Sequence, residues 1–353
     1  MATPSFAGLP DLFQFQDGRR LSQPSDWLTR RQELFDLIID IEYGGFPVAP
    51  RQVVAEELIT HQAAQFGVAR HSQYRLRTEG GLSFLVDLLI PLGEKPFPVI
   101  LDGDTCWGPI ADDIKQTVLQ RGYALVAFNR TEIAPDTDTA GRTSGIYRAF
   151  PGGEYGALSA WAWGYSRCID FLLIQDFINP DQIVVTGHSR GGKATLLAGA
   201  VDERIALTAP NDSGCGGAGS YHRQGERSET LTDIIERFPY WFGPKLREFV
   251  GHEQQLPFDQ HDLKALIAPR ALLTTEALDD LWANPTGTWL THQAAREVFR
   301  LLGVEDQLGI WYRPGGHSHT LIDWQALLAF ADWKFRGQTP DRSFNPNPFP
   351  ELR

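Results

Sequence analysis

Apolar residues recur in two different spacings along the first third of the chain. Residues 27–41 place leucine and isoleucine three and four positions apart, which is typical of one face of an α-helix. Residues 53–60, 71–78 and 82–90 follow as extended segments, and apolar and polar residues alternate in 71–78. No helical pattern separates these segments, so we expect the sheet to begin with antiparallel strands.

From residue 98 onward, strands alternate with helices. Strands are predicted at residues 98–102, 123–129, 182–186, 205–210, 270–276 and 308–313. Helices are predicted at residues 110–120, 155–175, 190–200, 287–302 and 321–335. Alternating βα units favour the α/β class, with an open, mostly parallel, doubly wound sheet that carries helices on both faces.

The chain is expected to form a single domain over residues 1–353. Residues 1–25 are polar and turn-rich and are interpreted as an N-terminal extension. Residues 214–266 are rich in aromatic residues, glycine and charge, and we expect this insertion to shape a pocket. Residues 343–353 form a tail rich in proline and asparagine. The long loop at 130–154 is a candidate functional segment.

Composition narrows the classes of protein that this pattern allows. Of the 353 residues, 42% are hydrophobic, and ten Trp and 21 Phe can supply a substantial core. A net charge of −12 argues against nucleic acid as a partner, because phosphate binding needs a concentrated basic surface. The apolar runs are shorter than a membrane span, so no membrane partner is expected. We also expect a monomer.

The ends and the cysteines bear on the location of the protein. Residues 1–10 lack the basic and apolar segments of a signal peptide. This predicts a cytoplasmic location for the chain as written, or a secreted or periplasmic one if a leader has been removed. Cys106, Cys168 and Cys215 are widely spaced, so they indicate neither a disulfide framework nor a zinc ribbon.

The turn at residues 187–191 reads G-x-S-x-G between a predicted strand and a predicted helix, which is the context of a nucleophile elbow. Such a turn is too sharp for side chains at Gly187 and Gly191. Ser189 would stand exposed above the sheet, at a helix N-terminus that stabilises negative charge. The backbone N–H of Arg190 and the turn at 103–108 are the expected oxyanion donors, and the Arg190 guanidinium can bind an oxyanion or an anionic substrate.

Two phosphate-binding motifs compete with this interpretation. Residues 187–193 match the first seven positions of a P-loop, but Ala194 stands where a hydroxyl must bind Mg²⁺. Residues 214–219 match G-x-G-x-x-G, but a polar stretch follows rather than a packed helix. We therefore expect no cofactor and no metal.

A serine nucleophile requires a base and a carboxylate that orients the base. His317 and His319 both follow the last predicted strand, and His317 is favoured because the two glycines before it permit a close approach. A metal site formed by these two histidines is not favoured, because no acidic or cysteine cluster joins them in sequence.

The orienting carboxylate has more than one candidate. Asp280 follows the strand at 270–276, one strand before the histidine, and is favoured. Asp212 follows the strand at 205–210 and stays open as the alternative. Asp279 is interpreted as a solvated or capping carboxylate.

Four segments together resemble the glucuronoyl esterases, carbohydrate esterase family 15, of bacterial type. Residues 187–193 resemble the signature G-C-S-R-x-G-K, with His188 in place of the common cysteine. Residues 211–218 are similar to E-S-G-x-G-G-A, and residues 280–285 resemble D-x-W-x-N-P. Residues 156–164 are similar to a helix of that family.

The resemblance implies the α/β-hydrolase fold and a role for each candidate residue. It implies Ser189 as nucleophile, His317 as base, Asp280 or Asp212 as acid, Arg190 as oxyanion donor, Lys193 and Glu229 as ligands of sugar hydroxyls, and Trp282 as a wall of the sugar pocket.

The resulting hypothesis is a cofactor-free serine carboxylic-ester hydrolase that works through an acyl-enzyme. The resemblance implies small-molecule or oligosaccharide esters of (4-O-methyl-)glucuronic acid as substrates, such as the xylan-lignin linkages of plant cell walls. An acetyl-xylan esterase or another carbohydrate or small-ester esterase on the same scaffold is the alternative. A non-catalytic sugar-binding relative is the third possibility.

Overall fold

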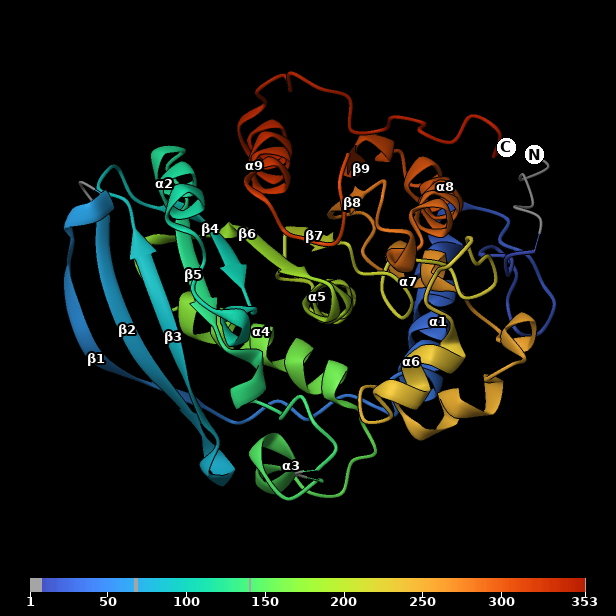
Figure 1. Cartoon of the computed structure of the whole chain (residues 1–353), viewed down its shortest axis with the longest axis horizontal. Coiled ribbons are helices and arrows are strands. Elements are labelled where there is room, and N and C mark those ends of the chain that lie inside the picture. Colours follow the sequence, from blue (N-terminus) through green and yellow to red (C-terminus); the bar gives the residue numbers. More distant parts are fainter. Residues whose placement is uncertain (1–7, 67–68, 140, 353) are drawn as a thin grey trace.

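A nine-stranded sheet with the order β1-β2-β3-β5-β4-β6-β7-β8-β9 forms the centre of the protein (Figure 1). The computed structural model describes residues 8–66, 69–139 and 141–352. The strands are β1 Val53–Ala63, β2 Ala69–Thr78, β3 Ser83–Ile90, β4 Phe97–Asp102, β5 Ala124–Phe128, β6 Ile178–His188, β7 Leu207–Asn211, β8 Ala271–Ala277 and β9 Leu308–Arg313. The α-helices are α1 Trp27–Ile41, α2 Asp112–Gln120, α3 Gly145–Ala149, α4 Ala157–Leu172, α5 Arg190–Val201, α6 Leu231–Arg237, α7 Gln260–Ala265, α8 Pro285–Leu301 and α9 Leu321–Arg336.

The sheet changes direction where the sequence pattern changes. β1, β2 and β3 pair antiparallel, and β3 also pairs antiparallel with β5. Every pair from β5 through β4 and β6 to β9 is parallel. The predicted antiparallel start and mostly parallel remainder are therefore confirmed. The predicted bounds of α1 and β9 agree with the structure, and the other predicted elements differ from it by a few residues at their ends.

Side chains of the parallel strands alternate between two cores. Val99 and Leu101 of β4 face the core that includes α4 and α5, whereas Ile100 faces the core that includes α2 and α9 (Figure 1). Trp161 and Trp163 of α4 are fully buried, as their place on a packed helix predicts. Among the residues described, none of the helices is both long and apolar enough to cross a membrane.

Short helices occupy the segments that the sequence pattern left as loop or insertion. The 130–154 loop contains η5, Arg130–Glu132, and α3. The 214–266 insertion contains α6 and α7. Each of these two helices begins with a capping box, from Thr230 and Asp259 respectively, which satisfies N-terminal N–H groups. Capping by single side chains does not depend on an apolar period, so periodicity alone misses such helices.

The N-terminal extension packs against α1 and α7. The carbonyl oxygen of Leu12 accepts a hydrogen bond from Arg30 Nε of α1 at 3.1 Å. The carbonyl oxygen of Pro10 lies 3.0 Å from His261 Nε2 of α7. Residues 1–7 of the predicted extension lie outside the described residues.

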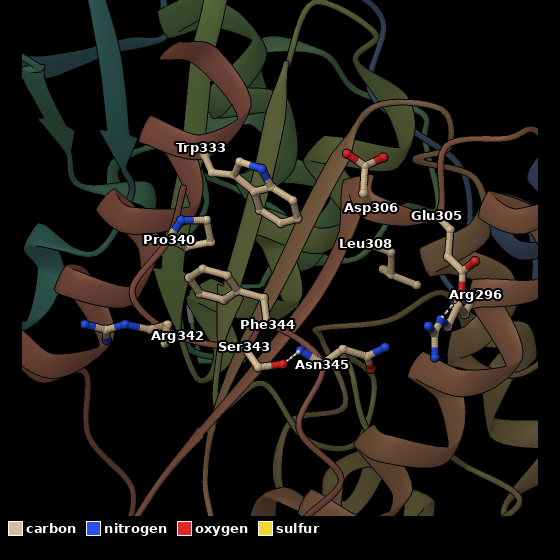
Figure 2. A pocket seen from close by; sticks show the side chains of 10 residues that line it. All are labelled: Arg296, Glu305, Asp306, Leu308, Trp333, Pro340, Arg342, Ser343, Phe344 and Asn345. Carbon is tan, nitrogen blue, oxygen red and sulfur yellow. Dashed lines mark hydrogen bonds and ion pairs between the residues drawn. The ribbon is translucent and has the colours of Figure 1, made fainter. Parts of the chain in front are cut away.

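The C-terminal tail covers the edge strand of the sheet. The backbone N–H of Ile310 in β9 donates to the carbonyl oxygen of Phe344 at 2.7 Å, so the tail supplies a partner to an edge that would otherwise be open. The Phe344 ring lies 5.0 Å from that of Phe330 in α9. Figure 2 shows Phe344 and Trp333 at a cavity of about 420 Å³ between the tail, α8 and α9.

Removal of the Phe344 ring tests whether this ring anchors the C-terminal tail to the rest of the protein. Phe344 is only 5% exposed. We expect Phe344→Ala to lower the free energy of unfolding by about 3 kcal/mol, because it removes a buried ring and leaves a cavity. Leu28, 75% exposed, is the control, and Leu28→Ala is expected to change stability by less than about 0.5 kcal/mol. Urea unfolding of both variants measures the difference, and equal midpoints would show that the tail is not anchored through this ring.

Candidate active site

Ser189 lies in the turn between β6 and α5, in a backbone conformation that side chains rarely adopt. Its φ is 55° and its ψ is −121°. The backbone N–H of Ser189 donates to the carbonyl oxygen of Asn211, at the end of β7, at 2.9 Å. A non-glycine residue held in this region by its surroundings is typical of functional sites. The turn therefore has the backbone geometry of a nucleophile elbow.

The glycines on either side of Ser189 are required by packing. A Cβ atom at Gly187 would lie 2.7 Å from Thr195 Oγ1 and 2.8 Å from the backbone of Gly191. A Cβ atom at Gly191 would collide with the carboxylate of Asp104. Both contacts are shorter than real Cβ atoms allow, so the steric role predicted for these glycines is confirmed.

His317 and Asp280 meet above the C-terminal ends of β8 and β9. His317 Nδ1 lies 2.5 Å from Asp280 Oδ2. An ionised carboxylate can only accept, so Nδ1 carries the proton and Nε2 keeps a lone pair. Asp280 is buried, whereas the His317 side chain is 43% exposed. The arrangement orients one imidazole and leaves its free nitrogen for proton transfer.

His188, next to Ser189 in the chain, places this imidazole beside the elbow. The ring centroids of His188 and His317 lie 4.4 Å apart. His188 Nδ1 is held 2.6 Å from Asn211 Oδ1. Burial and two neighbouring histidines lower the pKa of His188 to about 3, so its ring stays neutral at neutral pH.

His319 is a third histidine near His188 and His317, and its ring contacts that of His188. Its ring stacks on Trp324 of α9, with centroids 5.0 Å apart. Burial, and next the charge of Arg313, lower the pKa of His319 to about 3. Asp279 is exposed, which agrees with the solvated role that was one of its two predicted roles, and it accepts a hydrogen bond from the backbone N–H of Gly315 at 2.7 Å.

Asp212, the alternative acid, is engaged with other groups. Its Oδ1 accepts from the backbone N–H of Ala277 at 2.6 Å, and its Oδ2 accepts from Arg313 Nη2 at 3.1 Å. Burial, together with the charge of Asp280, raises the pKa of Asp212 to about 7. Both predicted acids come close to His317, but the His317 ring donates its hydrogen bond to Asp280.

Asp212, Asp280 and His317 also have the residue types of a metal site. Their polar atoms lie within 4.8 Å of one another. Ligand atoms around one zinc ion lie farther apart than a hydrogen-bonded pair. The 2.5 Å contact between His317 and Asp280 is therefore that of a hydrogen bond, as a triad requires.

Arg190 is the first residue of α5, so its backbone N–H has no acceptor within the helix. Its side chain turns toward the 130–154 loop, where Nη1 donates to Asp136 Oδ2 at 2.8 Å. Its guanidinium carbon lies 4.6 Å from the centre of the Trp241 ring and 4.8 Å from that of Phe238. The group is thus held beside the nucleophile by one carboxylate and two aromatic rings.

Lys193, Glu229 and Trp282 form a second cluster. Lys193 is buried and donates to the carbonyl oxygens of Ser213 and Cys215, both at 2.5 Å, and its Nζ lies 3.6 Å from Glu229 Oε2. The backbone N–H of Glu229 donates to the carbonyl oxygen of Trp282. The three residues predicted to contact sugar are therefore linked to one another, and two of the three N–H groups of the Lys193 ammonium are used by carbonyl oxygens.

Trp282 is the exposed member of this cluster. Its side chain is 39% exposed, and the guanidinium of Arg237 lies 4.9 Å from the centre of its ring. Arg237 was not among the predicted residues, because it ends a short helix of the insertion and belongs to no motif.

The turn after β4 supports the elbow from the other side. Asp104 Oδ2 accepts from the backbone N–H of His188 at 2.6 Å, and Asp104 also pairs with the fully buried Arg130. Trp107, 49% exposed, lies over the Arg130 guanidinium at 4.4 Å. The N–H groups of Gly103 and Asp104 donate to Tyr165 Oη and Asp102 Oδ1. The turn supplies a carboxylate that braces the turn at 187–191. Its expected role as an oxyanion donor stays a prediction.

The sheet order and the sharp turn between β6 and α5 define an α/β-hydrolase, in which the candidate nucleophile, acid and base follow the parallel strands β6, β8 and β9. A family model described as "Glucuronyl esterase, fungi" matches residues 77–303. The chain belongs to the glucuronoyl esterase family, carbohydrate esterase family 15.

Similar proteins come from fungi and bacteria. The 4-O-methyl-glucuronoyl methylesterase 1 of Phanerochaete chrysosporium is 34% identical over 330 residues, which are 89% of this chain and 66% of that protein. The chain thus spans slightly less than two thirds of that relative. The structure of a family 15 glucuronoyl esterase from Caldicellulosiruptor kristjansonii is 33% identical with a TM-score of 0.84, and the match covers 97% of this chain and 94% of that one.

A second solved structure holds a ligand. It is a glucuronoyl esterase variant from Sporotrichum thermophile in complex with methyl 4-O-methyl-β-D-glucopyranuronate. It is 27% identical to this chain with a TM-score of 0.78, and the match covers 98% of this chain and 93% of that one.

Substitution of each acid tests which one orients His317. We expect Asp280→Asn to lower kcat by about 10³- to 10⁴-fold, because an amide does not hold the imidazole in the required tautomer. We expect Asp212→Asn to lower kcat by less than about tenfold, because Asp212 acts through Arg313 and the backbone. Steady-state kinetics on one ester measure both, and circular dichroism controls for folding. A larger loss in Asp212→Asn would assign the acid to Asp212.

The raised pKa of Asp212 predicts a pH dependence of stability. Its pKa rises from 3.8 to about 7 in the folded protein. The folded state therefore binds this proton more tightly, and the resulting stabilisation is complete below pH 3.8 and lost as the pH rises through about 7. We expect Asp212→Asn to show a smaller fall in urea midpoint than the wild type between pH 4 and pH 8. Parallel curves for the two proteins would contradict this assignment.

Proposed function

We propose that this protein is a serine carboxylic-ester hydrolase that cleaves esters of glucuronic acid and 4-O-methyl-glucuronic acid through an acyl-enzyme. The observation that carries the proposal is the 2.5 Å hydrogen bond between Asp280 and His317, beside the left-handed turn at Ser189. Membership of the glucuronoyl esterase family supports the substrate class.

The proposed reaction has two halves, acylation and deacylation of Ser189, and the same nucleophile, base and acid act in both. Ser189 Oγ attacks the ester carbonyl while His317 Nε2 takes its proton, and Asp280 stabilises the imidazolium. Collapse of the tetrahedral intermediate breaks the ester bond, and His317 returns the proton to the leaving alcohol. A water molecule, deprotonated by His317, then attacks the acyl carbon. The bond to Ser189 Oγ breaks and His317 returns the proton to Oγ, which releases the uronic acid and free Ser189.

The oxyanion of each intermediate needs donors that are in place before it forms. The backbone N–H of Arg190 and its guanidinium are the proposed donors, since both belong to the residue that follows Ser189. A cation here also suits the carbonyl oxygen of the ester, which carries the developing negative charge.

Recognition of the sugar is assigned to the second cluster. Trp282 offers an exposed aromatic face, and Glu229 and Lys193 offer a carboxylate and an ammonium for sugar hydroxyls. The relative from Sporotrichum thermophile was crystallised with a methyl ester of 4-O-methyl-glucuronate, which supports the same acyl group here. Alcohols of lignin esterified to xylan are the proposed natural leaving groups, so the protein would act in lignocellulose degradation.

Turnover of two esters by the wild type and Ser189→Ala tests this function. We expect wild-type protein to hydrolyse benzyl glucuronate with a higher kcat/KM than an acetyl ester, and Ser189→Ala to lose at least about 10³-fold on both. Ser83→Ala, an exposed serine on β3, is the matched control and should retain full activity. A preference for the acetyl ester would identify a deacetylase on this scaffold. A folded wild type that is inert toward every ester and unlabelled by a fluorophosphonate would leave a sugar-binding protein.

A further inference from the structure

Asp136 joins three parts of the chain that are distant in sequence. It lies in the 130–154 loop, and its Oδ2 accepts from Arg190 Nη1 of α5 at 2.8 Å. Its Oδ1 accepts from Tyr240 Oη and from Trp241 Nε1, both at 2.9 Å. Both carboxylate oxygens are therefore used, one for the residue beside the nucleophile and one for the insertion.

The rings around Arg190 form a rigid support. Phe238 and Trp241 stack with their centroids 3.8 Å apart and their planes 3° from parallel. The fully buried Trp161 of α4 contacts Trp241 edge-on at 6.2 Å. The Arg190 guanidinium lies beside this stack, 4.8 Å from the centre of the Phe238 ring and 4.6 Å from that of Trp241. A flexible arginine side chain loses most of its rotamers in such a setting, so its orientation is set before substrate arrives.

The held guanidinium has a donor to spare. Arg190 Nε is buried and has no acceptor among the described residues. A buried N–H group without an acceptor is destabilising, so such groups in native structures call for an explanation. Arg190 directly follows Ser189, and the proposed attack by Ser189 develops negative charge on the carbonyl oxygen of the ester. Nε itself is out of reach of an incoming oxygen atom, but the Arg190 side chain as a whole is 26% exposed, so the guanidinium can be approached from the site.

We propose that Asp136 is a positioning residue that, with Tyr240 and Trp241, orients the guanidinium of Arg190 toward the oxyanion. The inference rests on the proposed esterase function and extends it to residues outside the catalytic motifs. The negative charge of Asp136 partly offsets the positive charge of Arg190. Donors that are fixed in advance nevertheless stabilise a transition state more than mobile donors do. The gain therefore lies in orientation.

This role predicts a kinetic signature that a purely structural role does not. An interaction realised only in the transition state changes kcat and leaves KM nearly unchanged. We expect Asp136→Asn to lower kcat by about 10- to 100-fold with KM within about twofold, because the amide no longer holds the guanidinium by charge. Arg190→Ala should lower kcat by about 10²- to 10³-fold.

The matched control is Asp138→Asn. Asp138 lies in the same loop, is exposed, and undergoes the same change of charge. Its kcat should stay within about twofold of the wild type, because its side chain lies outside the contacts that hold Arg190. Tyr240→Phe, which keeps the ring and removes one donor to Asp136, should lower kcat by about two- to fivefold and covers the case in which Asp136→Asn does not fold.

A double-variant cycle and a labelling reaction complete the experiment. The Asp136→Asn/Arg190→Ala variant should be no slower than Arg190→Ala alone, because Asp136 acts through Arg190. A fluorophosphonate forms a tetrahedral phosphonate ester on Ser189 as fluoride leaves, and its phosphoryl oxygen carries negative charge where the oxyanion would lie. Its rate constant of labelling should therefore fall in Asp136→Asn by the same factor as kcat.

The outcomes separate the two proposals. Additive losses in the double variant, an effect of Asp136→Asn on KM alone, or unchanged labelling in an active protein would overturn the role of Asp136. If the wild type is labelled but does not cleave uronate esters, slower labelling of Asp136→Asn still supports the positioning role while the substrate assignment falls. A wild type that is neither labelled nor active would overturn both proposals.

Discussion

The left-handed turn at Ser189 is the constraint on which the rest of the site depends. A serine with a φ of 55° is unfavourable on its own, so the turn persists only because its neighbours hold it. The carbonyl oxygen of Asn211, in β7, accepts a hydrogen bond from the backbone N–H of Ser189. The carboxylate of Asp104, in the turn after β4, accepts one from the backbone N–H of His188. Strands on both sides of β6 thus hold the turn, and the bare backbones of Gly187 and Gly191 allow this close approach.

Ion pairs between separate elements position the functional groups. Arg130 pairs with Asp104, Arg313 with Asp212, Lys193 with Glu229, and Arg190 with Asp136. Buried pairs of this kind contribute little net stability, because desolvation offsets most of their attraction. Their directional hydrogen bonds do restrict where each side chain lies. We therefore interpret these pairs as a means of fixing geometry rather than of raising stability.

The 214–266 insertion and the 130–154 loop meet at the elbow. The insertion contributes Phe238, Tyr240 and Trp241, and the loop contributes Asp136, so neither segment alone completes the surroundings of Arg190. This division explains why loops outside the sheet can tune one step of a reaction while the strands keep nucleophile, acid and base in place.

The sequence by itself determined the elements and the local turns. Strand and helix periods predicted β9 and α1 to the residue, and G-x-S-x-G predicted the turn at Ser189. Strand ends also predicted that His317 and an aspartate come together, because the carboxyl ends of parallel strands share one edge of the sheet.

Tertiary structure alone decided which side chains meet. The sequence favoured Asp280 but left Asp212 open as the acid, and only the path of the chain after β8 gives Asp280 the hydrogen bond to His317. Asp136 lies 54 positions from Arg190 and 104 from Tyr240, so no local pattern joins them. The physical reason is the distance along the chain over which each effect acts. Periodicity and turn chemistry act over a few residues, whereas the partners of a buried charge depend on how distant segments pack.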